Sequence, residues 1–251
     1  MQKSIYTYTV EQRDVDFSGR ATHVALIDYL LQAAGDDADN KGFGVSDLNQ
    51  GNCSWVLTRF AVEFGERPGC GSTITVATWV SDVNRFGTTR NMVVSGEGGE
   101  TIAMAVTQWA VIDLDRRAAI NLTELVDCSF ALVDEAPPVA MPLKVAPLTP
   151  ERKKRHTVVY SDIDFNRHVN AARYITWMFD MLPVEYFTGW RLARFDVNFI
   201  SEARYGDEVE IGYRTEGGKS LFSISSIGGG ALCRASMVWE PDADPNETIE
   251  L

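Results

Sequence analysis

The chain has 251 residues, of which 45% are hydrophobic, so it can bury the core of one large domain or of two modest ones. Its formal net charge of -12 argues against nucleic acid as the main partner, because binding to that backbone draws on many Lys and Arg contacts. No stretch approaches the roughly 20 apolar residues of a membrane span, and residues 1–10 lack the apolar core of a signal peptide. The sequence therefore predicts a cytoplasmic protein without a membrane span.

Each half of the chain is predicted to contain one long helix, followed by several antiparallel strands. Residues 1–10 alternate polar with aromatic or branched side chains, as a strand does, and a helix is expected over residues 24–34. The second helix is expected over residues 170–182, because Asn170 is a good N-cap and Pro183 ends the apolar pattern. Both helices are predicted to be mostly buried, with narrow polar stripes formed by Asp28, Gln32 and Asp36, and by Arg173, Thr176 and Asp180.

The strands that follow the helices belong to an internal repeat with a constant offset of 135 residues. Residues 55–64 (WVLTRFAVEF) align without a gap with residues 190–199 (WRLARFDVNF), and the alignment continues to Gly71 and Gly206. Apolar residues alternate in both copies, which is typical of strands with one buried face. Further alternating runs, separated by glycine turns, cover residues 91–95, 101–113, 221–226 and 231–239.

A long buried helix wrapped by an antiparallel sheet is the hot-dog arrangement, so the repeat predicts an α+β tandem (double) hot-dog fold. Five of the nine prolines lie between Pro137 and Pro150 and indicate an extended linker. We expect an N-terminal hot-dog domain at residues 1–130, a proline-rich linker at 131–154 and a C-terminal hot-dog domain at 155–251.

The turn before the second helix concentrates reactive side chains. Residues 161–170 (SDIDFNRHVN) place two carboxylates, an amide and an imidazole where a helix N-terminus supplies free N–H groups and a positive dipole end. Thioester hydrolysis requires a donor for the developing oxyanion, a base for water or a carboxylate nucleophile, and an acid for the leaving thiol. This turn is therefore a candidate active site.

The same segment resembles the signature of the acyl-acyl carrier protein thioesterases, which are plant fatty acyl thioesterases and their bacterial relatives. Their pattern of Asp, any residue, Asn, any residue and His-Val-Asn, followed by Tyr and Trp on the helix, is matched by Asp164, Asn166, His168, Val169, Asn170, Tyr174 and Trp177. Glu202 stands where the family carries a Glu after the second helix. The resemblance covers nearly the whole chain, including residues 55–57 and 109–113 of the first half.

The resemblance implies hydrolysis of fatty acyl thioesters of acyl carrier protein, with release of a free fatty acid and without a metal or organic cofactor. Asn166 and His168 would bind and polarise the thioester carbonyl, Asp164 would hold Asn166 or His168 in place, and Glu202 would activate water or attack directly. Many plant members carry a Cys directly after that Glu. Ala203 stands there in this chain, so a cysteine nucleophile at this position is excluded.

The first half does not repeat the reactive set. Asp16, Ser18 and Arg20 stand where the second half has the Asp, Asn and His, and Arg67 stands in the position of the Glu. We expect the first half to keep the fold and, by resemblance, to hold the acyl chain in its interior, with residues of its helix setting the chain length.

Basic side chains suggest two contacts for an acidic carrier protein. The run Arg152, Lys153, Lys154 and Arg155 is a candidate docking surface, although it also fits a solvated end of the linker. Arg173, beside the reactive turn, is the competing contact. The remaining histidines, His23 and His156, lack comparable sequence neighbours, Asp162 is expected to cap the turn, and four scattered cysteines are expected to be buried thiols: Cys53, Cys70, Cys128 and Cys233.

Two other functions use the same features. An acyl-CoA thioesterase would employ the same residues on a different carrier, and a non-catalytic acyl-binding protein or a hot-dog dehydratase would share the fold. A dehydratase needs a base placed for proton abstraction next to a carbonyl, and the full set of four residues resembles the hydrolase better. Acyl chain length and saturation, and assembly into a homodimer, are left open by the sequence.

Overall fold

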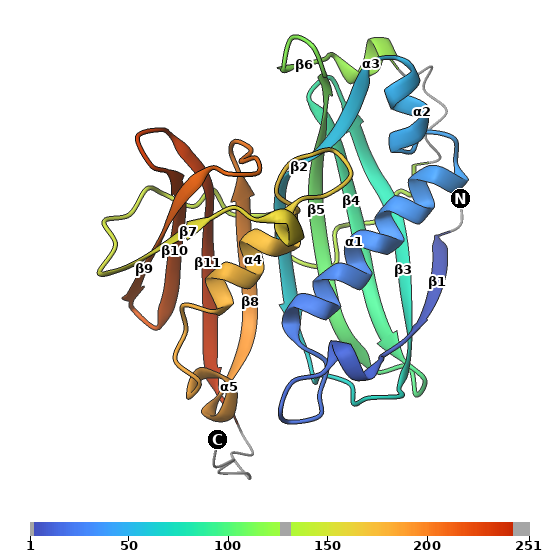
Figure 1. Cartoon of the computed structure of the whole chain (residues 1–251). Helices are drawn as coiled ribbons and strands as arrows, with labels where there is room; N and C mark the ends of the chain where they lie inside the picture. The colour runs from blue at the N-terminus through green and yellow to red at the C-terminus, as the bar shows by residue number, and fades with distance from the viewer. Residues whose placement is uncertain (1–2, 126–131, 243–251) are drawn as a thin grey trace. The chain divides into compact units, whose positions relative to one another are not determined.

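The computed structural model describes residues 3–125 and 132–242, which fall into two units, Met1–Pro142 and Leu143–Leu251 (Figure 1). The division at Pro142 lies inside the proline-rich segment. The described part of that segment before Arg152, residues 132–151, contains no helix or strand, whereas the predicted linker at 131–154 overlaps a strand that begins at Arg152. Among the described residues, no helix is long and apolar enough to span a membrane.

The first unit is a helix packed on an antiparallel sheet whose strand order is β1-β3-β4-β5-β2, with β6 beside β5. Its elements are β1 (Ser4–Thr9), η1 (Gln12–Asp14), α1 (His23–Asn40), α2 (Val45–Gln50), β2 (Cys53–Phe64), β3 (Thr73–Asn84), β4 (Gly87–Gly96), β5 (Thr101–Asp113), β6 (Ala118–Ala119) and α3 (Leu122–Leu125).

The second unit repeats this plan with the strand order β8-β11-β10-β9-β7, again antiparallel. Its elements are β7 (Arg152–Thr157), η2 (Tyr160–Asp162), α4 (Ala171–Phe179), α5 (Tyr186–Gly189), β8 (Trp190–Phe199), β9 (Glu208–Glu216), β10 (Lys219–Ser226) and β11 (Ala231–Pro241). Two helix-on-sheet units in tandem form the predicted α+β double hot-dog fold.

Each long helix starts at a side-chain cap and buries its apolar face. The Thr22 hydroxyl accepts from Ala25 N at 3.0 Å, and the Asn170 side chain accepts from Ala172 N at 2.9 Å. Figure 1 shows α1 running across one face of its sheet. Buried apolar side chains line the inner faces of both helices, namely Ala25, Leu26, Ile27, Leu30, Ala33 and Ala34 on α1, and Ala172, Ile175, Met178 and Phe179 on α4.

The helix ends differ from the prediction for local reasons. The first helix continues past residue 34 to Asn40, because the fully buried Asp37 is paired there with Arg90 of β4 at 2.6 Å and with Lys41 at 2.8 Å. A buried charge breaks the apolar pattern that marked the helix in the sequence. The second helix stops at Phe179 instead of residue 182, because the N–H of Leu182 bonds back only three residues, to Phe179 O at 3.0 Å.

The 135-residue repeat corresponds to equivalent strands in the two units. The aligned segments form β2 with β8 and then β3 with β9. Gly71 lies between β2 and β3, and Gly206 lies between β8 and β9. The two glycines adopt nearly the same left-handed conformation, with φ of 84° and 85°. Conformation as well as sequence is therefore repeated at this turn.

Candidate active site

The carboxylate of Asp164 organises the loop that precedes α4. Its Oδ1 atom accepts from Asn166 N at 2.8 Å and from His168 N at 3.3 Å. Asp164 N also donates to His168 O at 2.9 Å, which closes the loop, and Arg167 takes a left-handed φ of 65° at its tip. The spacing of Asp164, Asn166 and His168 therefore sets the shape of one loop, in which Asp164 positions the other two.

The start of this loop is fixed by Asp162 and His156. The buried Asp162 accepts from Val159 N at 2.8 Å, which makes it the expected cap of the turn, and it lies 2.9 Å from Nε2 of His156. His156 also packs against Trp177 of α4, with ring centroids 4.5 Å apart. The structure thus gives His156 two neighbours that the sequence did not reveal.

A second loop, which carries Glu202, is bonded to the first through its neighbour Ala203. Val169 N donates to Ala203 O at 2.9 Å, and Ala203 N donates to the hydroxyl of Tyr174 on α4 at 2.9 Å. Burial raises the pKa of Tyr174, so its hydroxyl stays neutral. These bonds hold the backbone beside Glu202 against the start of α4.

The two loops bring His168 and Glu202 together. Nε2 of His168 lies 3.4 Å from Oε2 of Glu202, although the residues are 34 positions apart in sequence. The side chains are 14% and 34% exposed, so the pair is shielded but reachable by water. An imidazole and a carboxylate at the start of a helix can polarise a carbonyl and activate water.

The equivalent position in the first unit holds an ion pair between Arg67 and Asp16. Nη1 of Arg67 lies 2.5 Å from Oδ2 of Asp16 and donates to Ala21 O at 2.9 Å. Burial opposes ionisation of Asp16, but its hydrogen bonds with Ser18 and its pairing with Arg67 lower the pKa of this carboxyl overall. Arg20, in the position of His168, instead pairs with Glu66 at 2.8 Å.

His23, at the start of α1, is buried and neutral. Its ring packs edge-on against Phe64 at 4.8 Å, and burial, aided by the charge of Arg67, lowers its pKa to about 3. His23 is thus a packed core side chain in the structure.

The described residues contain no group of three His, Cys, Asp or Glu side chains arranged to hold a metal ion. Cys53 and Cys233 are buried, as expected, and burial raises both thiol pKa values. The expectation is wrong for Cys70, which is exposed in the turn before β3, and Cys128 lies outside the described residues.

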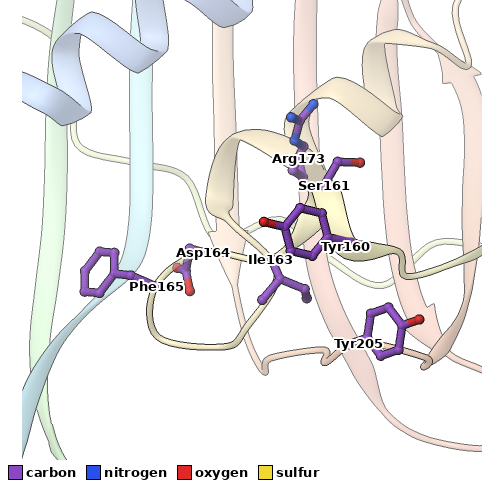
Figure 2. Close-up of a pocket in the computed structure, with 7 residues that line it drawn as sticks. All are labelled: Tyr160, Ser161, Ile163, Asp164, Phe165, Arg173 and Tyr205. Carbon is purple, nitrogen blue, oxygen red and sulfur yellow. The ribbon is translucent and has the colours of Figure 1, made fainter.

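An open cavity of about 630 Å³ borders the loop of residues 164–168, which we call the reactive loop (Figure 2). It shares Asp164 with that loop, and Arg173 of α4 lines it as well. The complete lining consists of Tyr160, Ser161, Ile163, Asp164, Phe165, Arg173 and Tyr205. The aromatic members of this lining could not be identified from the sequence, because single exposed aromatic residues carry no periodic signal.

The basic run lies apart from this cavity lining. Arg152, Lys153, Lys154 and Arg155 form most of β7, an edge strand of the second unit, and all four are exposed. Lys153 pairs with Glu210 of β9 at 2.8 Å. Charged side chains on an edge strand hinder pairing with another sheet, which gives the run a structural reason of its own.

Two family models match the chain. The model of the acyl-ACP thioesterase N-terminal domain matches residues 2–127, and the model of the C-terminal domain of the same enzymes matches residues 146–241, where ACP denotes acyl carrier protein. The second match contains the reactive loop and Glu202.

Individual relatives agree with the family models. A crystal structure of an acyl-ACP thioesterase from Bacteroides thetaiotaomicron is similar to this chain with a TM-score of 0.87 and 33% identity, over 95% of this chain and 98% of that one. The 12:0-ACP thioesterase from Umbellularia californica has a TM-score of 0.86 at 20% identity, over 96% and 98% of the two chains, and supports the fold.

A chloroplastic acyl-[acyl-carrier-protein] hydrolase from Cuphea viscosissima is 26% identical over 216 residues, which are 80% of this chain and 52% of that protein. The chain therefore spans about half the length of this curated relative. With both family models matched in order and a bacterial structure similar over its whole length, the chain belongs to the acyl-ACP thioesterase family.

Proposed function

We propose that this chain hydrolyses fatty acyl thioesters of acyl carrier protein and releases a free fatty acid. The observation that carries the proposal is the contact between His168 and Glu202, 3.4 Å apart beside the N-terminus of α4. Family membership and the names of the relatives support the choice of a thioester as substrate.

In the proposed mechanism, the side chains of Asn166 and His168 bind the thioester carbonyl oxygen and stabilise its negative charge as water attacks the carbonyl carbon. Glu202 takes a proton from that water as general base. The tetrahedral intermediate then collapses, the carbon–sulfur bond breaks, and the carrier thiolate leaves. It receives the proton that Glu202 took from water, which restores the Glu202 carboxylate. Direct attack by the Glu202 carboxylate, forming an anhydride that water hydrolyses, is the alternative role of the same residue.

Asp164 contributes by positioning. Its carboxylate already accepts from the N–H groups of Asn166 and His168, so it holds the backbone from which both side chains project. Such preorganisation matters because a misplacement of about 1 Å costs on the order of a hundredfold in rate.

The test is an assay of the purified full chain with the same acyl group as a thioester of ACP, of coenzyme A and of the small thiol N-acetylcysteamine. We expect free thiol and free fatty acid in equal amounts, with the highest kcat/KM for the acyl-ACP substrates. A preference for acyl-CoA would favour the acyl-CoA thioesterase, and tight binding of acyl-ACP without turnover would favour an acyl-binding protein. Either result would overturn the proposal.

A further inference from the structure

We propose that Tyr160, Phe165, Tyr205 and Arg173 form the docking surface for the acidic carrier protein that presents the thioester. This inference rests on the function proposed above and assigns the partner to one face of the second unit. We call these four residues the docking surface.

The docking surface exposes aromatic area to an unusual degree. Tyr160, Phe165 and Tyr205 are 88%, 75% and 71% exposed, and all three line the same cavity of about 630 Å³. Large apolar side chains that gather on one exposed face mark an interaction site, and Tyr and Arg are enriched among the residues that dominate binding energy. Figure 2 shows Phe165 on one side of the loop and Tyr160 and Tyr205 on the other, while Arg173 projects from α4.

The charge on this surface favours an acidic occupant. Arg173 is exposed, and neither it nor the nearby Arg167 and Arg204, exposed in the same two loops, forms an ion pair with another residue that the structure describes. The one carboxylate that lines the cavity, Asp164, accepts two backbone N–H groups. Unpaired cations in a chain with a net charge of -12 would draw an acidic partner to this face.

The docking surface is also connected to the proposed chemistry. Asp164 belongs both to the cavity and to the loop of His168, and Tyr205 follows Glu202 by three residues in the second loop. A carrier bound here would therefore contact both loops that form the His168–Glu202 pair. The exposed cations of β7 lack this connection, because none of them lines the cavity.

The test uses a variant that combines Arg173→Glu in the docking surface with Arg204→Glu in the adjoining loop that carries Glu202. Its matched control changes Arg152 and Lys154 of β7 to Glu. In both variants the net charge is more negative by four units than in the unaltered chain. Each is assayed with acyl-ACP and with the same acyl group on N-acetylcysteamine, and binding of ACP without an acyl group is measured directly. The unfolding midpoint of each variant reports on its fold.

We expect the Arg173 and Arg204 variant to raise KM for acyl-ACP and Kd for ACP by about tenfold or more, which corresponds to about 1.4 kcal/mol. We expect kcat/KM for the N-acetylcysteamine thioester to stay unchanged, and added salt to reduce the difference. A second variant, Phe165→Ser with Tyr205→Ser, should weaken ACP binding without changing the salt dependence.

Three results would overturn the docking surface: unchanged ACP binding in both surface variants, an equal loss with the β7 control, or stronger binding of the surface to anionic phospholipid vesicles than to ACP. The proposed function fails separately, through absence of hydrolysis with every thioester. In that case direct ACP binding still decides whether this surface receives the carrier.

Discussion

Glu202 and Arg67 occupy equivalent positions of the repeat, 135 residues apart, but Glu202 contacts a histidine and Arg67 contacts a carboxylate. Glu202 lies 3.4 Å from the imidazole of His168, whereas Arg67 lies 2.5 Å from the carboxylate of Asp16. The same turn of the fold thus holds a contact suited to acid–base chemistry in the second unit and a structural ion pair in the first.

This asymmetry predicts that Arg67→Met lowers stability and spares catalysis. Removing the guanidinium leaves the shielded carboxylate of Asp16 without its cation, which costs about 3 kcal/mol for a largely buried pair. Urea unfolding should show that loss, while kcat per folded molecule stays near that of the unaltered chain. Unchanged stability would mean that the ion pair contributes little to this turn.

Asp164→Ala is expected to lower kcat by about a hundredfold, because the N–H groups of Asn166 and His168 lose their shared acceptor and the loop shifts. Asp164→Asn keeps one oxygen that can accept these bonds, so it should retain much more activity. Steady-state kinetics of both variants provide the comparison. Equal loss in both would indicate that the charge of Asp164 matters more than its acceptor role.

Tyr174→Phe should weaken the connection between α4 and the loop of Glu202. Ala203 is buried, and its N–H would lose the hydroxyl acceptor, which costs about 1–3 kcal/mol of stability. We expect kcat to fall while KM changes little. Tyr186→Phe, which removes a hydroxyl bonded to Tyr213 elsewhere in the same unit, is the control and should keep kcat. A fall in kcat with the control alone would contradict the proposed connection.

His23 predicts a specific loss of stability in acid. Its pKa is about 3 in the folded chain and about 6.5 in the unfolded chain, so between these values the unfolded state binds the extra proton. Stability therefore falls as pH decreases from about 6.5 towards 3, by up to about 1.4 kcal/mol per pH unit.

Replacing His23 with Leu should remove this component while keeping an apolar side chain against Phe64. From pH 7 to pH 5, the unaltered chain should lose about 2 kcal/mol more unfolding free energy than the variant. Chemical unfolding at the two pH values measures the difference. Equal losses would show that His23 protonates in the folded chain.

The fold could be predicted from the sequence because its signals are periodic and occur twice. Alternation in residues 55–64 and 190–199 indicates strands β2 and β8, and Gly71 and Gly206 mark turns that require a left-handed backbone. The end of α1 could not be predicted, because Asp37 looks like a surface residue until its contact with Arg90 is known.

For the candidate site, the sequence indicated the residue types but not their contacts. Spacing placed Asp164, Asn166 and His168 in one turn, yet the approach of Glu202 to His168 depends on the bonds of Ala203 with Val169 and Tyr174. The proximity of His156 to Asp162 likewise depends on how β7 leads into η2. Such long-range geometry leaves no pattern in a single sequence.

The most direct test of the central claim is the rate at which acyl-ACP releases free fatty acid with the unaltered chain and with Glu202→Gln and His168→Ala, each shown to be folded by its unfolding midpoint. Loss of a general base or of carbonyl polarisation costs about 10²–10⁴-fold. We therefore predict that kcat falls at least a hundredfold in each variant with little change in stability. Full activity in both folded variants would contradict the assignment of these two residues to the active site.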